Sequence, residues 1–281
     1  MPAADDLVLF GADPEFPLTT KNGVPVAPWV ITKGTKDNHE LIGGGDCELH
    51  SDGVALEVNF NAAHGHSFKK RVRYVYNLVK SYCQERGAYI SVAPEFRGYS
   101  KDILEHPLVT SAIGCNLDYS AYSQATSIPR PPPVDSIKGD MRYFGGHLHF
   151  GYDISLCPPW AFVRFVEALV YLPIMRYDSQ KERRKYYGCA GLFRPKSYGV
   201  EYRTPSNFWV SRDNCIDVIT YNTTQIVQAL MESPEKTNKW FKDQPWKDVK
   251  RHVDTGESNG GTSLFSSMRS SFPMPLVSLD D

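Results

Sequence analysis

Pairs of polar residues separated by one position constrain the fold of this chain more than any other feature of its sequence. Side chains two positions apart on a β-strand point to the same face of the sheet. Five such pairs occur, most of them within apolar or glycine-rich stretches: Asp13 with Glu15, Asp46 with Glu48, Glu57 with Asn59, His147 with His149, and Glu201 with Arg203. The pattern predicts several strands that each present polar side chains on one face.

The residue types in these pairs are those that bind metal ions, with one arginine and one amide. A solvent-exposed strand face would more often mix Lys, Thr, Ser and Gln, although any single pair also fits such a face. Converging carboxylates repel one another unless cations neutralise them, and Arg203 supplies only one positive charge. Carboxylates with an imidazole suit Mg²⁺ or Mn²⁺. We therefore predict a site for at least two divalent ions, with zinc hydrolase chemistry as the minority alternative.

Apolar periodicity predicts helices between and after the strands. It indicates helices over residues 68–85, 158–177 and 214–231, with Pro173 kinking or ending the second and Ser211 capping the third. Strands are expected over residues 7–15, 54–60, 89–93, 142–152 and 199–204. The predicted class is α+β, with helices packed on one face of a mostly antiparallel sheet.

Two stretches of the sequence do not fit a regular helix or strand. Pro129–Pro133 contains four prolines and predicts a surface connection. Gly145 and Gly146 precede His147, and they indicate either a β-bulge or a backbone that a large ligand approaches closely.

Basic and aromatic residues alternate between Arg183 and Arg203. The basic members are Arg183, Arg184, Lys185, Arg194, Lys196 and Arg203, interleaved with Tyr186, Tyr187, Phe193 and Tyr198. Such a segment is either a solvated loop or a phosphate clamp with aromatic contacts for a nucleotide base, and a nucleic-acid groove uses the same residue types. No Walker A motif or dinucleotide fingerprint is present, so nucleotide binding would depend on metal ions and basic side chains.

Composition narrows the class of protein. The 281 residues carry a formal net charge of −1, which does not indicate nucleic acid or a membrane surface as partner. No apolar run approaches the ~18 residues of a membrane span, and the acidic start, Met1 to Asp6, is unlike a signal peptide. The six cysteines form no CxxC pair, which favours free thiols. A cytoplasmic location is expected.

Four motifs in order resemble the carboxylate–amine ligase superfamily, and most closely its phage-type amidoligase branch, related to glutamate–cysteine ligase and glutamine synthetase. The motifs are Gly11–Phe16, Asp52-Gly53 with Glu57, Gly145–Gly151, and Gly199–Arg203 followed by Asn207. The resemblance implies a curved antiparallel half-barrel that binds ATP and two or more Mg²⁺ ions. It also implies that a substrate carboxylate becomes an acyl phosphate, which an amine then converts to an amide.

The resemblance assigns roles to particular residues. It implies a set of metal ligands, namely Asp13, Glu15, Asp52, Glu57, His147 and Glu201. It makes Arg203 a phosphate contact and, with Glu57, a catalytic residue, while Arg194 and Lys196 are candidate ATP contacts by position and type. Asp46, Glu48, Asn59 and His149 are of second rank.

The remaining expectations concern organisation and partners. Residues 1–253 are expected to form one catalytic domain, followed by a Ser/Gly-rich, partly mobile tail over 254–281. The expected partners are small-molecule or peptide carboxylates and amines, with a nucleotide or nucleic-acid substrate permitted, and the location becomes the host cytoplasm if a phage encodes the chain. A non-catalytic nucleotide-binding protein with a degenerate site is a further alternative.

Overall fold

A computed structural model describes residues 6–110, 118–123, 139–178 and 180–280. Its centre is an eight-stranded sheet whose neighbouring strands all pair antiparallel, in the order β4-β5-β6-β1-β11-β13-β12-β9. The strands are β1 (Leu9–Phe16), β4 (Glu40–Ile42), β5 (Cys47–Asp52), β6 (Ala55–His64), β9 (Tyr119–Ser120), β11 (Gly146–Gly151), β12 (Leu192–Lys196) and β13 (Gly199–Tyr202). The α+β class and the antiparallel sheet are confirmed.

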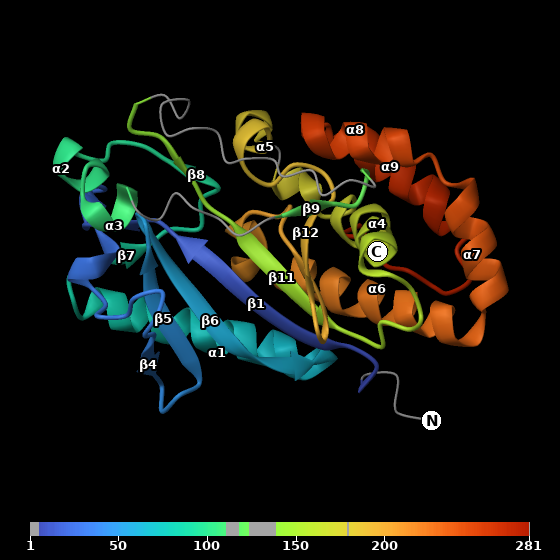
Figure 1. Cartoon of the computed structure of the whole chain (residues 1–281), viewed down its shortest axis with the longest axis horizontal. Coiled ribbons are helices and arrows are strands. Elements are labelled where there is room, and N and C mark those ends of the chain that lie inside the picture. Colours follow the sequence, from blue (N-terminus) through green and yellow to red (C-terminus); the bar gives the residue numbers. More distant parts are fainter. Residues whose placement is uncertain (1–5, 111–117, 124–138, 179, 281) are drawn as a thin grey trace.

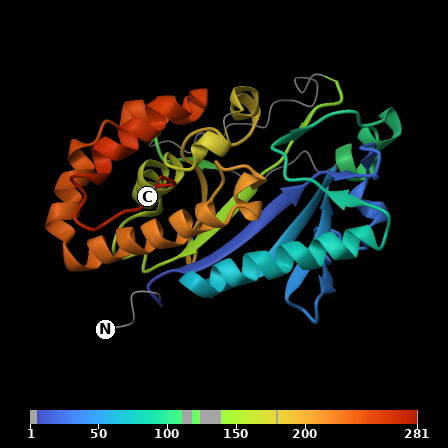
Figure 2. The same cartoon turned by 180° about the vertical axis from the view of Figure 1, so that it is seen from behind.

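Helices cover one face of this sheet. The helix α1 (Gly65–Gln84) lies behind β1 and β6, and α6 (Asp213–Glu232) continues the layer behind β11 (Figures 1 and 2). Phe10 of β1 packs on Phe68 of α1 with ring centroids 5.5 Å apart, so the even-numbered residues of β1 face this core. The odd-numbered side chains of β1, including Asp13 and Glu15, therefore point away from the helices.

The predicted helices are present with small changes at their ends. The second comprises α4 (Pro159–Val166) and a π-helical turn over Glu167–Tyr171, and Pro173 follows the point where this helix ends. The predicted cap of α6 is wrong, because Ser211 lies in a 3₁₀ turn and Arg212 precedes the helix without a side-chain cap. The strand expected over 142–152 divides at Gly145 into β10 (Arg142–Tyr143), which pairs with β8 (Glu95–Phe96), and β11.

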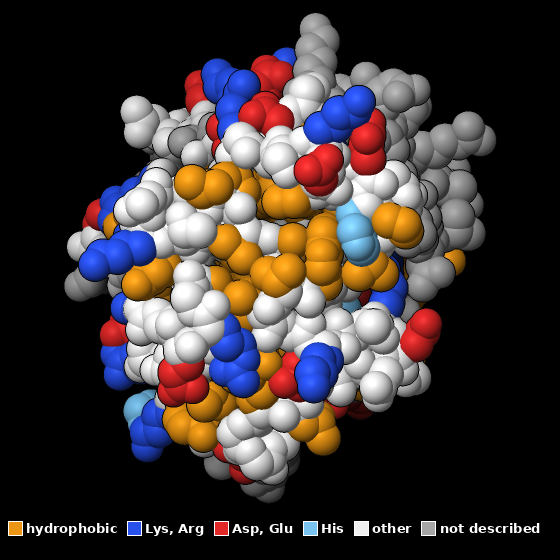
Figure 3. Space-filling model, turned by 90° about the vertical axis from the view of Figure 1, so that its left-hand side faces the viewer, with side chains coloured by type: hydrophobic (Ala, Val, Ile, Leu, Met, Phe, Trp, Pro, Cys, Tyr) orange, Lys and Arg blue, Asp and Glu red, His pale blue; other side chains and the backbone are white. Residues whose placement is uncertain are grey.

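The smaller elements complete the fold. Strands β2 (Leu18–Thr19), β3 (Pro25–Val26) and β7 (Tyr89–Ile90) form a separate sheet of three strands, so the strand expected over 89–93 is shorter than predicted. Short helices α2 (Lys101–Leu104), α3 (Pro107–Thr110) and α5 (Lys181–Tyr186) lie in the connections. Apolar side chains gather on the surface at the α2 and α3 end of the molecule (Figure 3), where Val30 and Leu108 are exposed.

The C-terminal region contains more helix than its sequence indicated. After α7 (Pro234–Asp243) and α8 (Trp246–Thr255), residues Ser258–Arg269 form helix α9, within the stretch that was expected to be a Ser/Gly-rich, partly mobile tail. Phe265 and Met268 of α9 are buried in the core, and these apolar anchors outweigh the low helix propensity of the surrounding Ser and Gly residues. The predicted division at residue 253 stays a prediction.

Two sequence features fall wholly or partly outside the described residues. The proline-rich stretch Pro129–Pro133 and Cys115 lie outside them. The other five cysteines are free thiols, as expected.

Candidate active site

Strand pairing aligns the polar residues in rows across the open face of the sheet. Asp13 on β1 is directly opposite His147 on β11, and His149 is opposite Glu201 on β13. On the other side of β1, Glu15 is opposite Glu57 on β6. Residues opposite one another in antiparallel strands share a face of the sheet, so these pairs lie on the face that points away from α1.

The acids and histidines form two groups, in each of which one ligand atom per residue lies within 4.8 Å of the others. The first, which we call the oxygen group, is Glu15, Asp52 and Glu57. The second, the mixed group, is Asp13, His149 and Glu201. The structure thus brings five of the six predicted metal ligands into two groups and adds His149, which the sequence had placed in the second rank. The sixth, His147, belongs to neither group, but its Nδ1 lies 3.3 Å from Asp13 Oδ1.

The oxygen group carries more negative charge than its surroundings balance. Burial and the nearby charges of Asp13, Glu15 and Asp52 raise the pKa of Glu57 well above its usual range. The nearest imidazole, His50, lies 3.6 Å from Glu57, but burial lowers the pKa of His50 to about 4 and leaves it neutral. Three oxygen ligands with excess negative charge fit a hard divalent cation such as Mg²⁺.

In the mixed group, basic side chains surround the carboxylate of Glu201. Glu201 lies 2.7 Å from Lys196 Nζ and 3.5 Å from Arg194 Nη1, and it also contacts Arg203. Burial and Asp13 oppose the charged form of Glu201, but Arg203 and His147 outweigh them and the pKa falls to about 2. The three predicted phosphate contacts therefore converge on one metal-ligand candidate.

Histidines provide the counter-charge for Asp13. His147 Nδ1 and His149 Nε2 each lie 3.3 Å from Asp13 Oδ1. Burial opposes ionisation of Asp13, but the two imidazoles outweigh it and hold the pKa of Asp13 well below its usual range. Asp13 Oδ1 and His149 Nε2 are buried and have no hydrogen-bond partner among the described residues, as ligand atoms would be before a cation binds.

Two residues of the site were missed in the sequence. Asp118, beside β9, accepts a hydrogen bond from Arg194 Nε at 2.7 Å and lies 3.3 Å from Arg203 Nε. Tyr187 donates to Glu15 Oε1 at 2.7 Å and lies 2.6 Å from His147 Nε2. No sequence pattern pointed to Asp118, because the adjacent strand β9 is only two residues long. Tyr187 had been noted among the aromatic residues of the basic segment, but no role was assigned to it.

The phosphate-clamp interpretation is wrong for the first two arginines of the basic segment. Arg183 is fully buried and donates to the backbone carbonyls of Phe144, Thr204 and Pro205 at 2.9–3.0 Å. Arg184 is also buried and pairs with Asp178 at 3.5 Å. Arg183 ties the chain before β11 to the chain after β13, so its role is to hold the strands that carry His147 and Glu201.

A Cβ at either glycine before His147 would lie less than 3.0 Å from another atom of the protein. A Cβ at Gly145 would lie 2.5 Å from His147 Nε2 and 2.8 Å from Tyr187 Oη. A Cβ at Gly146 would lie 2.4 Å from the carbonyl oxygen of Ser206. The glycines therefore allow close packing within the protein.

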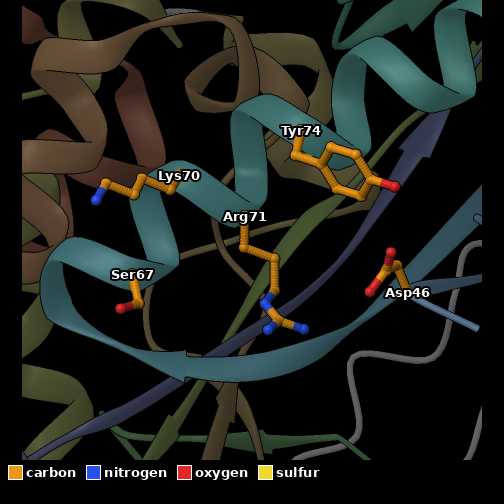
Figure 4. Close-up of a pocket in the computed structure, with 5 residues that line it drawn as sticks. All are labelled: Asp46, Ser67, Lys70, Arg71 and Tyr74. Carbon is orange, nitrogen blue, oxygen red and sulfur yellow. The ribbon is translucent and has the colours of Figure 1, made fainter.

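The second-rank acids lie apart from both groups. Asp46 lines a surface hollow of about 240 Å³ with Ser67, Lys70, Arg71 and Tyr74 of α1 (Figure 4). Glu48 pairs with His39 at 2.7 Å, and Asn59 is its strand neighbour.

Comparisons with known proteins support a ligase. Residues 124–246 match the model of a family described as phage phiEco32-like COOH.NH2 ligase-type 2, which confirms the resemblance seen in the motifs. The matched range includes His147, Glu201 and Arg203, whereas Asp13, Glu15, Asp52 and Glu57 precede it.

Other comparisons add less. A crystal structure of a novel glutamine synthase homolog aligns with a TM-score of 0.46 and 13% identity, covering 96% of this chain. This chain spans 63% of the length of that homolog. None of the curated proteins matches. Among the described residues, no helix is both long and apolar enough to cross a membrane.

Proposed function

We propose that this chain is an ATP- and Mg²⁺-dependent ligase that joins a carboxylate to an amine through an acyl phosphate. The observation that carries the proposal is the convergence of Glu15, Asp52 and Glu57 beside a basic set. That set is Arg194, Lys196 and Arg203, which meet at Glu201. A site with opposed clusters of acids and bases suits a metal-bridged triphosphate. The family match over residues 124–246 supports the same chemistry.

The proposed reaction has two steps. A carboxylate oxygen attacks the γ-phosphorus of ATP, the bond to the ADP oxygen breaks, and an acyl phosphate forms. The amine nitrogen then attacks the acyl carbon, the carbon–oxygen bond to phosphate breaks, and the nitrogen loses a proton. Bound divalent ions would neutralise phosphate charge, held by Glu15, Asp52 and Glu57 in the oxygen group and by Asp13, His149 and Glu201 in the mixed group. The neighbouring His147, 3.3 Å from Asp13, would complete the mixed group.

The basic residues have separate parts in this proposal. Arg203, buried against Glu201 and Asp118, would contact the transferring phosphoryl group and stabilise its charge. Arg194 and Lys196 are half-buried and would bind the remaining phosphates of ATP. Since all three are paired with acids in this structure, ATP and metal ions would exchange these partners for phosphate.

Trapping with hydroxylamine tests the proposal without knowledge of the amine. Hydroxylamine attacks an acyl phosphate and releases phosphate and a hydroxamate. With ATP, Mg²⁺ and pooled carboxylates, we expect ADP and hydroxamate in equal amounts, and neither with Glu57→Gln. If pooled substrates give no Mg²⁺-dependent ADP and no nucleotide raises the melting temperature, the chain is not the proposed ligase.

A zinc-dependent amide hydrolase is the second candidate. The imidazoles of His147 and His149 beside Asp13 favour it, because zinc accepts such a donor set. Stoichiometric zinc in the purified protein, with amide cleavage that needs no ATP, would support the hydrolase. A non-catalytic nucleotide-binding protein would bind ATP without forming ADP.

The setting of the activity is also part of the proposal. The substrates would be small-molecule or peptide carboxylates and amines, and the basic face around Arg194 also admits a nucleotide or nucleic-acid substrate. The reaction would take place in the cytoplasm, or in the host cytoplasm for a phage protein. Mn²⁺ would substitute for Mg²⁺.

A further inference from the structure

One side of α1 presents polar side chains to the turn over residues 43–46, which joins β4 to β5. The spacing of these side chains along α1 is i, i+3, i+4 and i+7, which places them in one stripe. The stripe is Ser67, Lys70, Arg71 and Tyr74, and with Asp46 of the turn it lines the hollow of about 240 Å³ (Figure 4). Because α1 covers the face of the sheet opposite the metal-ligand candidates, this hollow is separate from the candidate active site.

Two cations of the stripe lack a carboxylate partner. Lys70 and Arg71 form no ion pair among the residues that the structure describes, whereas Lys69 and Arg73 of the same helix pair with aspartates of α6. Among the described residues that line the hollow, Asp46 is the one acid. The lining thus carries two positive charges against one negative charge, and this excess favours an anionic ligand.

The donors at the basic end of the hollow suit a phosphate group. A guanidinium, an ammonium and a hydroxyl lie within about one turn of α1, on Arg71, Lys70 and Ser67. Together they can donate to each of the three terminal oxygens of a phosphate monoester. The fork of an arginine also matches phosphate through two parallel hydrogen bonds. A carboxylate has only two oxygens to share among the same donors.

The opposite end of the hollow suits hydroxyl groups. The Tyr74 hydroxyl points at Asp46 (Figure 4), and their hydrogen bond raises the pKa of Tyr74. The Asp46 carboxylate can accept further hydrogen bonds, and its charge disfavours a second anionic group at this end. The Tyr74 ring is half exposed and offers a flat face to a sugar ring. A ligand that fits both ends therefore carries a phosphate at one end and hydroxyl groups at the other.

The turn that carries Asp46 is packed closely on α1. Gly43 has a φ of +61°, and a Cβ there would lie 2.5 Å from Leu78 Cδ2 and 3.4 Å from Tyr74 Oη. The left-handed backbone and the close contact with the helix both favour glycine. This packing sets the position of Asp46 relative to the stripe, so both walls of the hollow are in place before a ligand binds.

We propose that the hollow between α1 and the turn over residues 43–46 is a binding site for a sugar phosphate. Ser67, Lys70 and Arg71 bind the phosphate oxygens. Asp46 accepts hydrogen bonds from the sugar hydroxyls, and the Tyr74 ring packs on the sugar. The site is separate from the proposed ATP site, and the inference does not depend on the proposed ligase activity.

Isothermal titration of the full chain tests the proposal. The titrations are done with chelator and without ATP, so that no divalent ion can bind phosphate at the candidate active site. The probes are ribose 5-phosphate and ethyl phosphate, which share a phosphate monoester but differ in their hydroxyl groups. We expect one ribose 5-phosphate per chain and about tenfold weaker binding of ethyl phosphate, because a hydrogen bond to a charged group is worth ~1.5–3 kcal/mol.

Variants of the lining separate its two ends. Lys70→Gln and Arg71→Gln should each weaken the binding of ribose 5-phosphate by ~10–100-fold, since each removes a charged donor. Asp46→Ala should retain phosphate binding and lose the preference for ribose 5-phosphate over ethyl phosphate. Lys80 is exposed on the same helix but does not line the hollow, so Lys80→Gln is the control and should bind as the wild type does.

Three results would overturn the inference. The first is a wild type that binds no ribose 5-phosphate. The second is an Arg71→Gln variant that keeps the wild-type affinity and melting temperature. The third is a loss of binding in Arg203→Ala but not in Arg71→Gln, which would show that the sugar phosphate binds at the candidate active site. None of these results would count against Mg²⁺-dependent ligation, which hydroxylamine trapping tests separately.

Discussion

Glu15 and Glu57 occupy directly opposed positions on the neighbouring antiparallel strands β1 and β6. Like charges in such positions destabilise a sheet, and Asp52 lies close enough to add to the repulsion. The pKa of Glu57 is raised well above its usual range, first by burial and then by Asp13 and Glu15. The fold thus retains an unfavourable electrostatic arrangement, as functional sites often do.

Replacing Glu57 with a neutral side chain should change stability and activity in opposite directions. In the metal-free protein, Glu57→Gln should raise the free energy of unfolding, because a raised carboxyl pKa means that ionisation destabilises the folded state as the pH rises. The same variant should lower turnover at least ~10²-fold, the effect of removing one preorganised charge. Urea denaturation with chelator and an ADP assay measure the two effects.

A second carboxylate serves as the control. Glu48 on β5 lies outside both groups and pairs with His39. Glu48→Gln should change the free energy of unfolding and the turnover far less than Glu57→Gln does. A loss of stability in metal-free Glu57→Gln would show that the acids do not repel one another as inferred.

Removal of Arg203 should affect catalysis far more than cation binding at the oxygen group. Arg203 contacts Asp118 and, in the mixed group, Glu201. Among the residues that the structure describes, it forms no ion pair with Glu15 or Asp52. Arg203→Ala should lower ADP formation by ~10³-fold or more, as for other phosphate-contacting arginines. Isothermal titration with Mg²⁺ should give a near-normal affinity, and near-normal turnover would count against the assigned role.

Gly145 should not tolerate even one added methyl group. The new Cβ of Gly145→Ala would lie 2.5 Å from His147 Nε2 and 2.8 Å from Tyr187 Oη, so these side chains must separate. Overpacking of this kind typically costs about 1–3 kcal/mol, and a circular dichroism melt measures it. Gly11→Ala is the control, since its Cβ meets His149 Cβ at an ordinary 3.4 Å. Equal stability of both variants would contradict the close packing described for Gly145.

Glu167, buried on the helix side of the sheet, gives a pH dependence that is independent of metal ions. Its Oε1 accepts from the Gly191 amide at 2.6 Å and from the Tyr202 hydroxyl at 3.0 Å. Burial raises its pKa from 4.5 to about 7. The protonated form is therefore favoured by folding, and this contribution is complete below pH 4.5 and lost as the pH rises through about 7.

Glu167→Gln should remove this pH dependence. The contribution is about 3 kcal/mol, since each unit of pKa corresponds to ~1.4 kcal/mol. The wild type should lose roughly that much free energy of unfolding between acidic and mildly alkaline pH, and the variant should lose less. Urea denaturation at several pH values measures the free energy of unfolding of both proteins. If this free energy changes equally with pH in the wild type and in Glu167→Gln, the pKa of Glu167 is not raised.

Much of the sheet was predictable because alternation of apolar and polar residues reports on both faces at once. Phe10, Ala12 and Phe16 face the core, and Asp13 and Glu15 between them face the site. The same alternation placed Glu57, His147 and Glu201. The helices α1 and α6 were equally clear, because their apolar residues recur with helical spacing over twenty residues each.

Other parts depend on contacts that the sequence does not encode locally. The burial of Arg183 against three backbone carbonyls follows from the meeting of chain segments near residues 144 and 204. Asp118 joins the site only because β9 pairs with β12. His149 was ranked low because it falls at a position of the family motif where relatives vary. The motif does not report the contact of 2.7 Å between His149 Nδ1 and the Tyr198 hydroxyl.

Isotope transfer tests the central claim of amide formation through an acyl phosphate. Once hydroxylamine trapping has identified a carboxylate, that substrate is labelled with ¹⁸O and incubated with ATP, Mg²⁺, the protein and an amine. We predict that each phosphate released carries one ¹⁸O atom from the carboxylate, and that Glu57→Gln releases none. Formation of ADP and amide with unlabelled phosphate would contradict the acyl-phosphate route.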